Sequence, residues 1–340
     1  MEQPRQGYCF TAIVGQDDMK TALILNVINP NLGGVLIRGE KGTAKSTAVR
    51  ALAELLPERR EVVDCRFGCA PEDLAHMCSE CLEKLEQGVV LEESRGKMKV
   101  VDLPVSATED RVVGTLDMEH AIKTGEKKFE TGILANANRN ILYVDEVNLL
   151  DDHVVDILLD SAAMGVNTVE REGVSYTHPA RFILVGTMNP EEGDLRPQLI
   201  DRFALSVTVV GERGVDKRVL VMENRLKYED EPEAFFTEFE PMQQTLREKI
   251  ETAKDLLAKV TYSGKILEKI AKICIALDVD GHRADIVMLK TAITFAAYNG
   301  RLEVLEEDVI EAAKLTLPHR MRRNPFEDTI LDLSQLEGIA

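Results

Sequence analysis

Apolar residues in the first 210 positions form short unbroken runs, each followed by a stretch with apolar residues at helical spacing. Such runs are typical of strands buried on both faces of a parallel sheet. The candidate strands are 35–37, 61–66, 97–103, 141–146, 182–186 and 205–210. From residue 241 onward the periodicity is helical throughout. The pattern therefore predicts an α/β domain over 1–236 and an all-α domain over 237–340, divided at the acidic stretch 229–240.

Helices and one hairpin are expected at defined places along this pattern. An amphipathic helix capped by Asp17 precedes the first strand, a second helix covers 45–56, and a third begins at an Asp151 cap. The helices of the second domain are expected at 242–260, 266–277, 283–297 and 305–317. Residues 166–178 alternate about Glu172-Gly173 and predict a β-hairpin that projects from the sheet.

A glycine-containing loop joins the first strand to the second helix. It comprises Gly39, Glu40, Lys41, Gly42, Thr43, Ala44, Lys45, Ser46 and Thr47. In such a strand–loop–helix unit the backbone N–H groups point at an anion, Lys45 reaches the β- and γ-phosphates, and Ser46 ligates Mg²⁺. The alternative is a glycine turn that happens to precede a lysine. We interpret the loop as a cradle for the phosphates of a nucleoside triphosphate.

One position of this loop departs from the usual G-x-x-x-x-G-K-[ST] pattern. Ala44 stands where the second glycine is expected. Because the Cβ of alanine disfavours positive φ, we expect Ala44 to enter the helix with right-handed dihedral angles.

Polar side chains follow two of the later apolar strands. Asp145 and Glu146 end the run 141–146, and Asn189 comes shortly after the run 182–186. Since the carboxyl ends of parallel strands meet at one edge of a sheet, all three are expected beside the loop. There Asp145 supports Mg²⁺, Glu146 polarises the attacking water and Asn189 orients it. The alternatives are a strand that ends in solvated acids and an Asn-Pro turn that opens a loop.

Three further groups are weaker candidates for the same site. The segment Ile13-Val14-Gly15-Gln16 is a candidate wall for the adenine ring, although packing of the first helix is the favoured explanation. Arg202 offers a guanidinium for phosphate charge, with a surface salt bridge as the ordinary alternative. Arg283 begins the third C-terminal helix, where a cation can face the nucleotide or solvent.

Four of the six cysteines form two close pairs, Cys65-x3-Cys69 and Cys78-x2-Cys81. Paired thiolates on two short turns can converge tetrahedrally on Zn²⁺, and an iron–sulfur cluster uses the same ligands. Small buried hydrophobic residues without a ligand are the remaining alternative. We place zinc ahead of an iron–sulfur cluster and interpret 65–81 as an insertion outside the nucleotide motifs, in which the metal orders the segment or builds a partner surface.

The overall composition limits the classes of partner. The formal net charge is -18, which argues against general affinity for nucleic acid or for an anionic membrane. No apolar run approaches the roughly 20 residues needed to cross a bilayer, and no signal peptide is evident at the N-terminus. We therefore expect a cytoplasmic protein with protein or small-molecule partners.

With these residues identified, the chain resembles the ATPase subunit I of magnesium chelatase, a branch of the AAA+ superfamily near the MoxR group. The resemblance covers nearly the whole chain. Its densest matches are 101–104, 107–114, 142–153, 169–173, 178–182, 189–193, 196–199 and 201–203. It implies a P-loop NTPase with a five-stranded parallel sheet core and a C-terminal all-α lid.

The resemblance also implies roles for particular residues. Asn189 is similar to sensor 1, Arg202 to an arginine finger that acts on the neighbouring subunit's nucleotide, and Arg283 to sensor 2. Residues 108–138 are similar to the helix 2 insertion and 166–178 to the pre-sensor 1 hairpin. Such subunits form hexameric rings and act with an integrin-I-domain adaptor and a large porphyrin-binding subunit, where metal insertion takes place.

The expected function is therefore that of an Mg²⁺-dependent ATPase motor of a tetrapyrrole metal chelatase. Two departures keep alternatives open. Ala44 also occurs in MoxR-type loops, and the cysteine cluster lies where many magnesium chelatase subunits have a plain loop. The alternatives are a MoxR-type chaperone that matures a protein client and the equivalent subunit of a cobalt chelatase.

Overall fold

A five-stranded parallel sheet forms the centre of the computed structural model, which describes residues 7–116, 129–171, 174–193, 195–279 and 281–321. Its strands stand in the order β11-β1-β10-β7-β4. Their bounds are Val35–Gly39 (β1), Val100–Leu103 (β4), Ile141–Val144 (β7), Ile183–Met188 (β10) and Leu205–Val209 (β11). Every neighbouring pair is parallel. The expected five-stranded sheet is thus confirmed, but the candidate strand 61–66 is not part of it, since residues 61–62 end a short strand, Arg59–Val62, of a separate antiparallel pair.

Each face of the sheet packs on its own apolar core. Along β1, Val35 and Ile37 belong to one core and Leu36 to the other, because successive side chains of a strand point to opposite faces. All residues of β7 and of β10 are buried. This two-sided burial explains why the strands are unbroken apolar runs in the sequence.

The first helix differs from its prediction. The helix α1 (Asp17–Ile28) has Gln16 at its N-cap in a left-handed conformation, and no side chain caps it. Asp17 lies inside the helix and pairs with Lys20 at 2.9 Å. From Ala22 to Ile28 every residue is buried, so the helix is not amphipathic. Because α1 packs on α2, β1, β11, α10 and α12 together, apolar burial on several sides replaces the expected single face.

The other helices of the α/β part agree better with expectation. The helix α2 (Lys45–Leu55) follows β1 directly, and α7 (Asp152–Met164) is capped by the Asp151 carboxylate, which accepts from the His153 N–H at 2.9 Å. The short helix α8 (Pro197–Arg202) precedes β11. Shorter helical segments are α4 (Glu109–Val113) and α6 (Ile133–Ala137).

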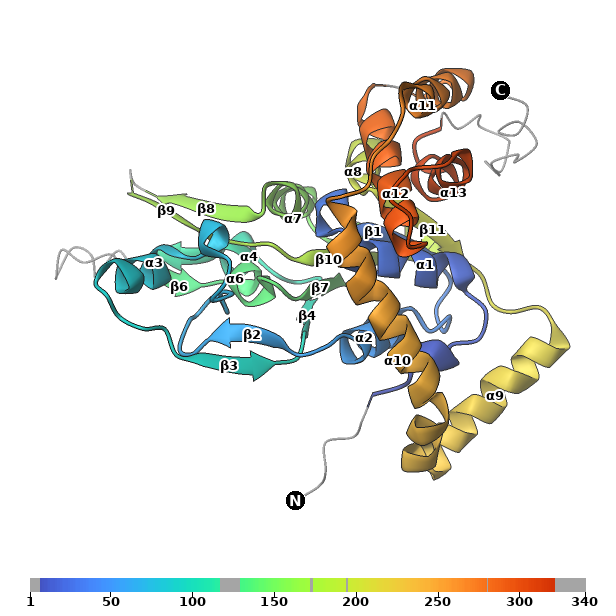
Figure 1. The fold of residues 1–340 in the computed structure, drawn as a ribbon, viewed down its shortest axis with the longest axis horizontal. Helices are drawn as coiled ribbons and strands as arrows, with labels where there is room; N and C mark the ends of the chain where they lie inside the picture. Colours follow the sequence, from blue (N-terminus) through green and yellow to red (C-terminus); the bar gives the residue numbers. More distant parts are fainter. Residues whose placement is uncertain (1–6, 117–128, 172–173, 194, 280, 322–340) are drawn as a thin grey trace.

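The helical part begins earlier than the periodicity indicated. It comprises α9 (Val215–Asp230), α10 (Pro232–Leu257), α11 (Gly264–Ala276), α12 (Arg283–Tyr298) and α13 (Glu306–Thr316). The acidic stretch 229–240 is helical except at Glu231, which separates α9 from α10, and position 237 lies inside the continuous helix α10. A division of the chain at 236/237 therefore falls on a helix and not on a linker. Figure 1 shows α11, α12 and α13 gathered at one side of the sheet, with α10 running along it.

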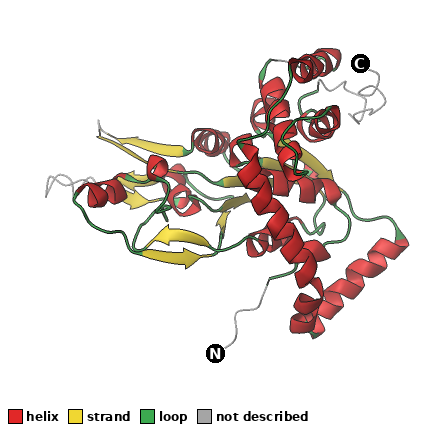
Figure 2. Ribbon diagram, in the orientation of Figure 1, coloured by secondary structure: helices red, strands yellow, loops and turns green. Residues whose placement is uncertain are grey.

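Three small antiparallel sheets lie toward the other end of the molecule (Figures 1 and 2). They pair β2 (Arg59–Val62) with β3 (Glu93–Gly96), β5 (Gly114–Leu116) with β6 (Phe129–Thr131), and β8 (Val166–Arg171) with β9 (Val174–Pro179). The β8–β9 pair confirms the expected hairpin, whose turn at 172–173 lies outside the described residues. Most of the expected insertion 108–138 is described except 117–128. The helix α3 (Ser79–Glu86) completes this end.

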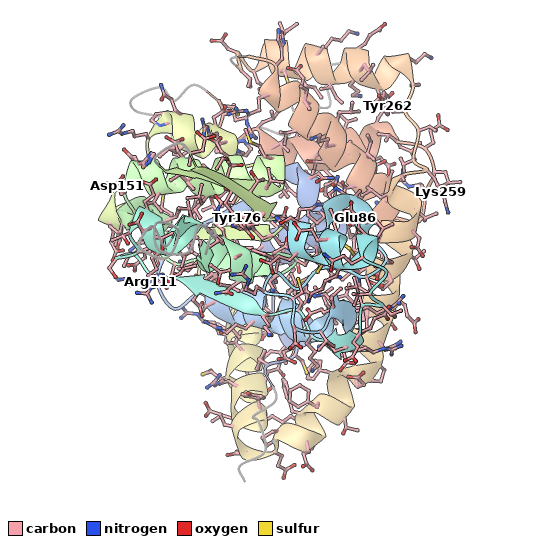
Figure 3. The ribbon with its side chains drawn as sticks, turned by 90° about the vertical axis from the view of Figure 1, so that its left-hand side faces the viewer. Glu86, Arg111, Asp151, Tyr176, Lys259 and Tyr262 are labelled. Atoms are coloured by element: carbon pink, nitrogen blue, oxygen red, sulfur yellow. The ribbon has the colours of Figure 1, made fainter. Side chains whose placement is uncertain are left out.

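Figure 3 looks onto this end, with Tyr176 and Glu86 on the facing surface and Lys259 and Tyr262 at the side of the helical part. Among the described residues, no helix is both long and apolar enough to cross a membrane.

Candidate active site

The loop between β1 and α2 has the geometry of a phosphate cradle. Gly39 adopts φ +153°, and a Cβ there would lie 2.1 Å from the Val209 carbonyl oxygen, so only glycine fits. The Lys45 Nζ donates to the Gly39 carbonyl at 2.5 Å and to the Glu40 carbonyl at 2.9 Å. Partial burial lowers the pKa of Lys45, and the negative charges of Asp145 and Glu146 offset only part of this shift. The lysine therefore lies at the loop, within the field of the two acids.

Ala44 contradicts its prediction. It adopts φ 59° and ψ 21°, a left-handed conformation, as the residue immediately before α2. The expectation of right-handed dihedrals considered only the local preference of alanine. The chain must reverse between Gly42 and the first turn of α2, and Ala44 carries this reversal at a cost of about 1–2 kcal/mol for a residue with a Cβ.

The two acids at the end of β7 and Asn189 after β10 lie at the same edge of the sheet as the loop, as expected for adjacent parallel strands. Glu146 has a left-handed backbone, φ 54° and ψ 55°, which turns the chain away after the strand. Asn189 is 6% exposed, and its side-chain oxygen accepts from the Glu191 N–H at 3.3 Å. An amide, two carboxylates and a lysine thus meet at one edge.

Thr187 and Tyr143 hold the two acids in place, and sequence reasoning assigned them no role. The Thr187 hydroxyl donates to the Asp145 carboxylate at 2.5 Å and accepts from the Glu146 N–H at 3.1 Å. The Tyr143 hydroxyl donates to Asp145 at 3.0 Å. The only signal in the sequence was the position of Thr187 at the carboxyl end of a buried strand, two residues before Asn189.

Lys41 connects the loop to the acids. Its Nζ lies 3.3 Å from Glu146 Oε1 and 2.6 Å from Glu192 Oε1. The Lys41 ammonium, which donates a hydrogen bond to the Glu192 carboxylate, lowers the pKa of Glu192. Lys41 was expected only as part of the cradle, and Glu192 was not expected at all. An ion pair from the loop to Glu146 restrains the carboxylate that is the candidate base.

A cavity of about 530 Å³ opens beside the loop. Its lining includes Val14 and Gln16 as predicted, together with Thr43, Ala44 and Thr47 of the loop and, from α9, Val221 and Met222. Gly15 adopts φ +64°, and a Cβ there would lie 1.8 Å from Glu212 Oε1. An apolar cavity next to a phosphate cradle fits the base and sugar of a nucleotide. The residues present therefore fit ATP, with Ser46 and Asp145 as the groups available to Mg²⁺.

The two expected arginines have other partners. Arg202 pairs with Asp156 and Asp160 of α7, both at 2.8 Å, and Arg283 pairs with Asp201 at 2.9 Å. Asp201 also pairs with Arg320, which is 9% exposed and was not singled out from the sequence. No ion pair between these arginines and the loop is recorded in the described part of the chain. Within one subunit, the structure does not bring Arg202 and Arg283 to the phosphate cradle.

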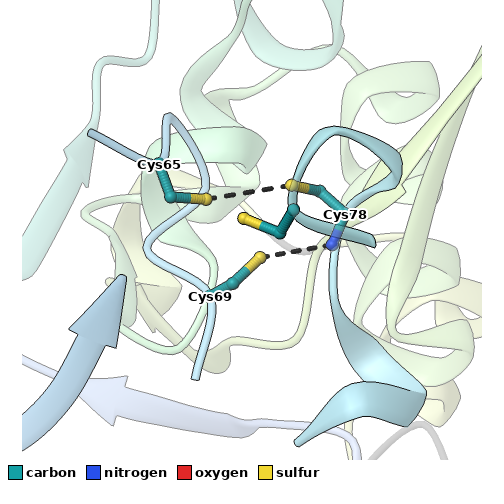
Figure 4. Close-up of side chains that lie close together, drawn as sticks. Cys65, Cys69 and Cys78 are labelled. Atoms are coloured by element: carbon teal, nitrogen blue, oxygen red, sulfur yellow. Dashed lines mark hydrogen bonds between the residues drawn. The ribbon is translucent and has the colours of Figure 1, made fainter. Parts of the chain in front are cut away.

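The four clustered cysteines form a second candidate site. Their sulfur atoms all lie within 4.8 Å of one another. Figure 4 shows Cys65, Cys69 and Cys78 pointing toward a common centre, with the Cys65 and Cys78 sulfurs 3.8 Å apart. Hydrogen bonds from Cys69 and Cys78 lower the pKa of Cys65. The spacing in the sequence thus predicted correctly which cysteines come together.

The sheet order, the cradle, the acids at the adjacent strand ends and the helical lid define an AAA+ ATPase. A family model described as AAA lid domain matches residues 267–338. A putative ATPase from Cytophaga hutchinsonii has the same fold, with a TM-score of 0.63 at 19% identity over 97% of this chain and 90% of that one.

Relatives of higher sequence identity show the family to which the chain belongs. A model described as magnesium chelatase, subunit ChlI, matches residues 108–210. The chain is 60% identical to the magnesium-chelatase subunit ChlI homolog of Methanocaldococcus jannaschii over 97% of this chain and 90% of the relative. It is 51% identical to the magnesium-chelatase subunit ChlI of Synechocystis over 94% and 89%. The chain belongs to the magnesium-chelatase subunit ChlI family.

A solved structure of a relative agrees with this assignment. It comes from a cryo-EM-based model of the complex between subunits BchI and BchD of magnesium chelatase. The matched chain is 46% identical, with a TM-score of 0.57, over 94% of this chain and 98% of that one.

Proposed function

We propose that this protein is the ATP-hydrolysing motor of a tetrapyrrole metal chelatase, and that it drives metal insertion by a separate porphyrin-binding subunit. The observation that carries the proposal is the meeting of Lys45, Asp145, Glu146 and Asn189 at one edge of the sheet in a chain of this family. In this proposal the insertion chemistry belongs to the porphyrin-binding partner.

The roles of the residues follow from their positions. Lys45 binds the β- and γ-phosphates, and Ser46 and Asp145 hold the Mg²⁺ that accompanies ATP. Glu146 accepts a proton from the attacking water and Asn189 orients that water. The walls of the base pocket include Val14 and Gln16, which flank Gly15, together with Val221 and Met222 of α9.

Arg202 and Arg283 act on phosphate charge in an assembled ring. Arg202 projects from α8 onto α7 and has no recorded partner in its own cradle among the described residues. This orientation supports a finger that reaches the nucleotide of the next subunit in a homo-hexamer. Arg283 stands at the first position of α12 and is exposed, so it can approach the nucleotide when the lid closes.

The partners are a BchD-like adaptor with an integrin-I domain and a large porphyrin-binding subunit. The BchI relative was solved in complex with BchD, which supports the first of these. We place the assembly in the cytoplasm, because all six cysteines are free thiols and a reducing compartment preserves them. At the four clustered cysteines we propose a metal ion, with zinc ahead of an iron–sulfur cluster.

The test is hydrolysis by a Glu146→Gln variant. The variant should still bind Mg·ATP, because Lys45 and the cradle are unchanged, while turnover falls about 10²-fold or more. Nucleotide binding is measured by equilibrium titration and turnover by phosphate release. Glu248→Gln, an exposed change on α10, is the matched control and should hydrolyse ATP normally. Near-normal hydrolysis by Glu146→Gln would refute the assigned base.

A further inference from the structure

We propose that Cys65, Cys69, Cys78 and Cys81 hold one zinc ion, and that this ion fixes the two loops against which β6 and the β8–β9 hairpin pack. The inference deepens the metal assignment proposed above. It states how many metal ions the site holds and which part of the structure they stabilise. We call the segment 65–81 the cysteine module.

The distances between the sulfurs favour a single ion. With Zn–S bonds of about 2.3 Å, the edges of a tetrahedral four-thiolate site are about 3.8 Å long. The Cys65 and Cys78 sulfurs are 3.8 Å apart, and no pair exceeds 4.8 Å. An iron–sulfur cluster inserts its own iron and sulfide atoms between the cysteines and would hold their sulfurs farther apart than a single ion does. The cysteine module has room for one ion and not for a cluster.

The surroundings of the sulfurs suit thiolate ligands. Cys69, Cys78 and Cys81 are almost completely buried, and Cys65 is partly exposed and leaves a way in for an ion. The backbone N–H of Cys78 donates to the Cys69 sulfur at 3.2 Å. Such an N–H stabilises the negative charge that a metal-bound thiolate carries.

Apart from three of its cysteines, the cysteine module buries only Phe67, Ala70 and Met77, so apolar burial accounts for part of its order. The helix α3 has eight residues, of which only Cys81 is buried, and the helical turn Leu74–His76 has no buried residue. Leu85 of α3 also packs on the core but is only partly buried, and a helix this short is marginal without tertiary support. Metal ligation supplies folding free energy to segments of this kind, since the ligands converge only in the folded state.

The residues between the ligands contact the neighbouring hairpins. Phe67, between Cys65 and Cys69, is 1% exposed and stacks on the buried His178 ring of β9, with the ring centroids 5.0 Å apart. The carbonyl of Phe67 accepts from the Asn138 side chain at 2.8 Å. His178 in turn accepts from Asn167 of β8 at 3.0 Å. The first cysteine loop therefore supports both strands of the hairpin.

A second set of contacts starts from both cysteine pairs. Arg66, in the first loop, donates to the Phe129 carbonyl of β6 at 2.8 Å and pairs with Glu80, which lies between Cys78 and Cys81. The Tyr176 hydroxyl donates to the same Glu80 carboxylate at 3.4 Å, and its ring stacks on Phe129 at 4.3 Å. If the loops move, these contacts to β6 and β9 are lost together.

The first experiment measures metal in the full-length protein purified without air or chelator. Elemental analysis should find about one zinc per chain and no iron or acid-labile sulfide. Cobalt exchanged into the unaltered protein should give the absorption bands of a tetrahedral four-thiolate site. The cobalt measurement needs no variant and so does not depend on the folding of one.

The second experiment tests the structural task. Cys78→Ser should lose zinc, whereas Cys274→Ser, a change at an equally buried cysteine outside the module, should retain it. In the zinc-free protein, amide hydrogen exchange over 166–171 and 174–179 should be at least about tenfold faster, and exchange in β1 and β10 should not change. Mg·ATP binding by the same samples reports whether the nucleotide domain is folded.

The outcomes separate this inference from the proposed motor function. Iron with sulfide, a disulfide between the clustered cysteines, or a metal-free protein with four reactive thiols would each overturn the zinc site. Unchanged exchange in the hairpin after zinc loss would overturn its structural task. Failure of ATP hydrolysis in zinc-loaded protein would count against the motor assignment and not against the site.

Discussion

The two candidate sites of this molecule are held together by different forces. At the nucleotide edge, side chains stand on the ends of β7 and β10, whose residues are all buried. In the cysteine module, the helical turn Leu74–His76 has no buried residue, and α3, which begins at Ser79, has one. The first site is positioned by a hydrophobic core that needs no ligand. The second depends on four thiols that converge from two loops, so its order should change with its metal content.

The largest effect we expect is a loss of ATP turnover when the arginine proposed to act across the subunit boundary is removed. Arg202→Ala should lower ATP turnover about 10³-fold or more, as expected for loss of a guanidinium that neutralises transition-state charge. The cysteine module should keep its zinc in this variant. Arg196→Ala, a nearby exposed arginine paired with Asp152, is the matched control and should retain activity. Turnover is measured by phosphate release at saturating ATP.

Mixing two variant subunits distinguishes an arginine finger supplied by the neighbouring subunit from a role of Arg202 within its own subunit. Subunits carrying Arg202→Ala should regain activity when mixed with subunits carrying Lys45→Ala, because each supplies what the other lacks. The same loss of turnover with no recovery on mixing would show that Arg202 acts in its own subunit, through its pairs with Asp156 and Asp160.

A smaller effect is expected from Thr187→Val, which keeps the shape of the side chain and removes its hydroxyl. Asp145 then loses a donor at 2.5 Å, and the Glu146 N–H loses its acceptor. Losses of this kind of supporting hydrogen bond cost about 10–100-fold in metal affinity or activity. We expect this loss to appear as a weaker apparent affinity for Mg²⁺ in turnover measurements, because Asp145 is the group that Thr187 orients.

The control for Thr187→Val is a threonine on the β8–β9 hairpin, away from the nucleotide edge. Thr168 on β8 bonds to Thr177 across the hairpin at 3.0 Å, so Thr168→Val removes a comparable hydroxyl without touching the acids. It should leave the Mg²⁺ dependence unchanged. Equal effects of the two valines would mean that Thr187 contributes only general stability.

The sequence predicted the nucleotide edge well because long-range geometry there follows from local pattern. Unbroken apolar runs identified the parallel strands, and parallel strands bring their carboxyl ends to one edge. This pattern alone is enough to place Asp145, Glu146 and Asn189 together. Thr187 was missed because a threonine inside a strand carries no distinct signal, and only its partners reveal its role.

Elements that lack an apolar pattern were predicted poorly or not at all. The strand β3 reads Glu-Ser-Arg-Gly, so nothing marked it as a partner for β2. The helix α9 was missed because it is mostly exposed and Asn224 is its only buried residue. The four cysteines were an exception, since ligand spacing is a pattern of its own and predicted their convergence. Their contacts with His178 and Tyr176, far along the chain, had no signal in the sequence.

The smallest effect we expect comes from the residue whose conformation was predicted wrongly. Ala44 is left-handed, which costs about 1–2 kcal/mol for a residue with a Cβ. Glycine removes this cost but adds about 0.5–1 kcal/mol of backbone entropy to the unfolded chain. Ala44→Gly should therefore stabilise the protein by about 0.5–1 kcal/mol, measured by denaturant unfolding, with ATP binding retained.

The same alanine-to-glycine substitution one helical turn later should change the stability of the protein in the opposite direction. Ala48 is right-handed within α2 and fully buried, so Ala48→Gly removes a packed methyl group and should destabilise the protein by about 1 kcal/mol or more. If Ala44→Gly also destabilised the protein, the alanine would have to be favoured by contacts of its own methyl group. That result would shift the explanation of the loop from backbone strain to packing against the nucleotide pocket, which Ala44 lines.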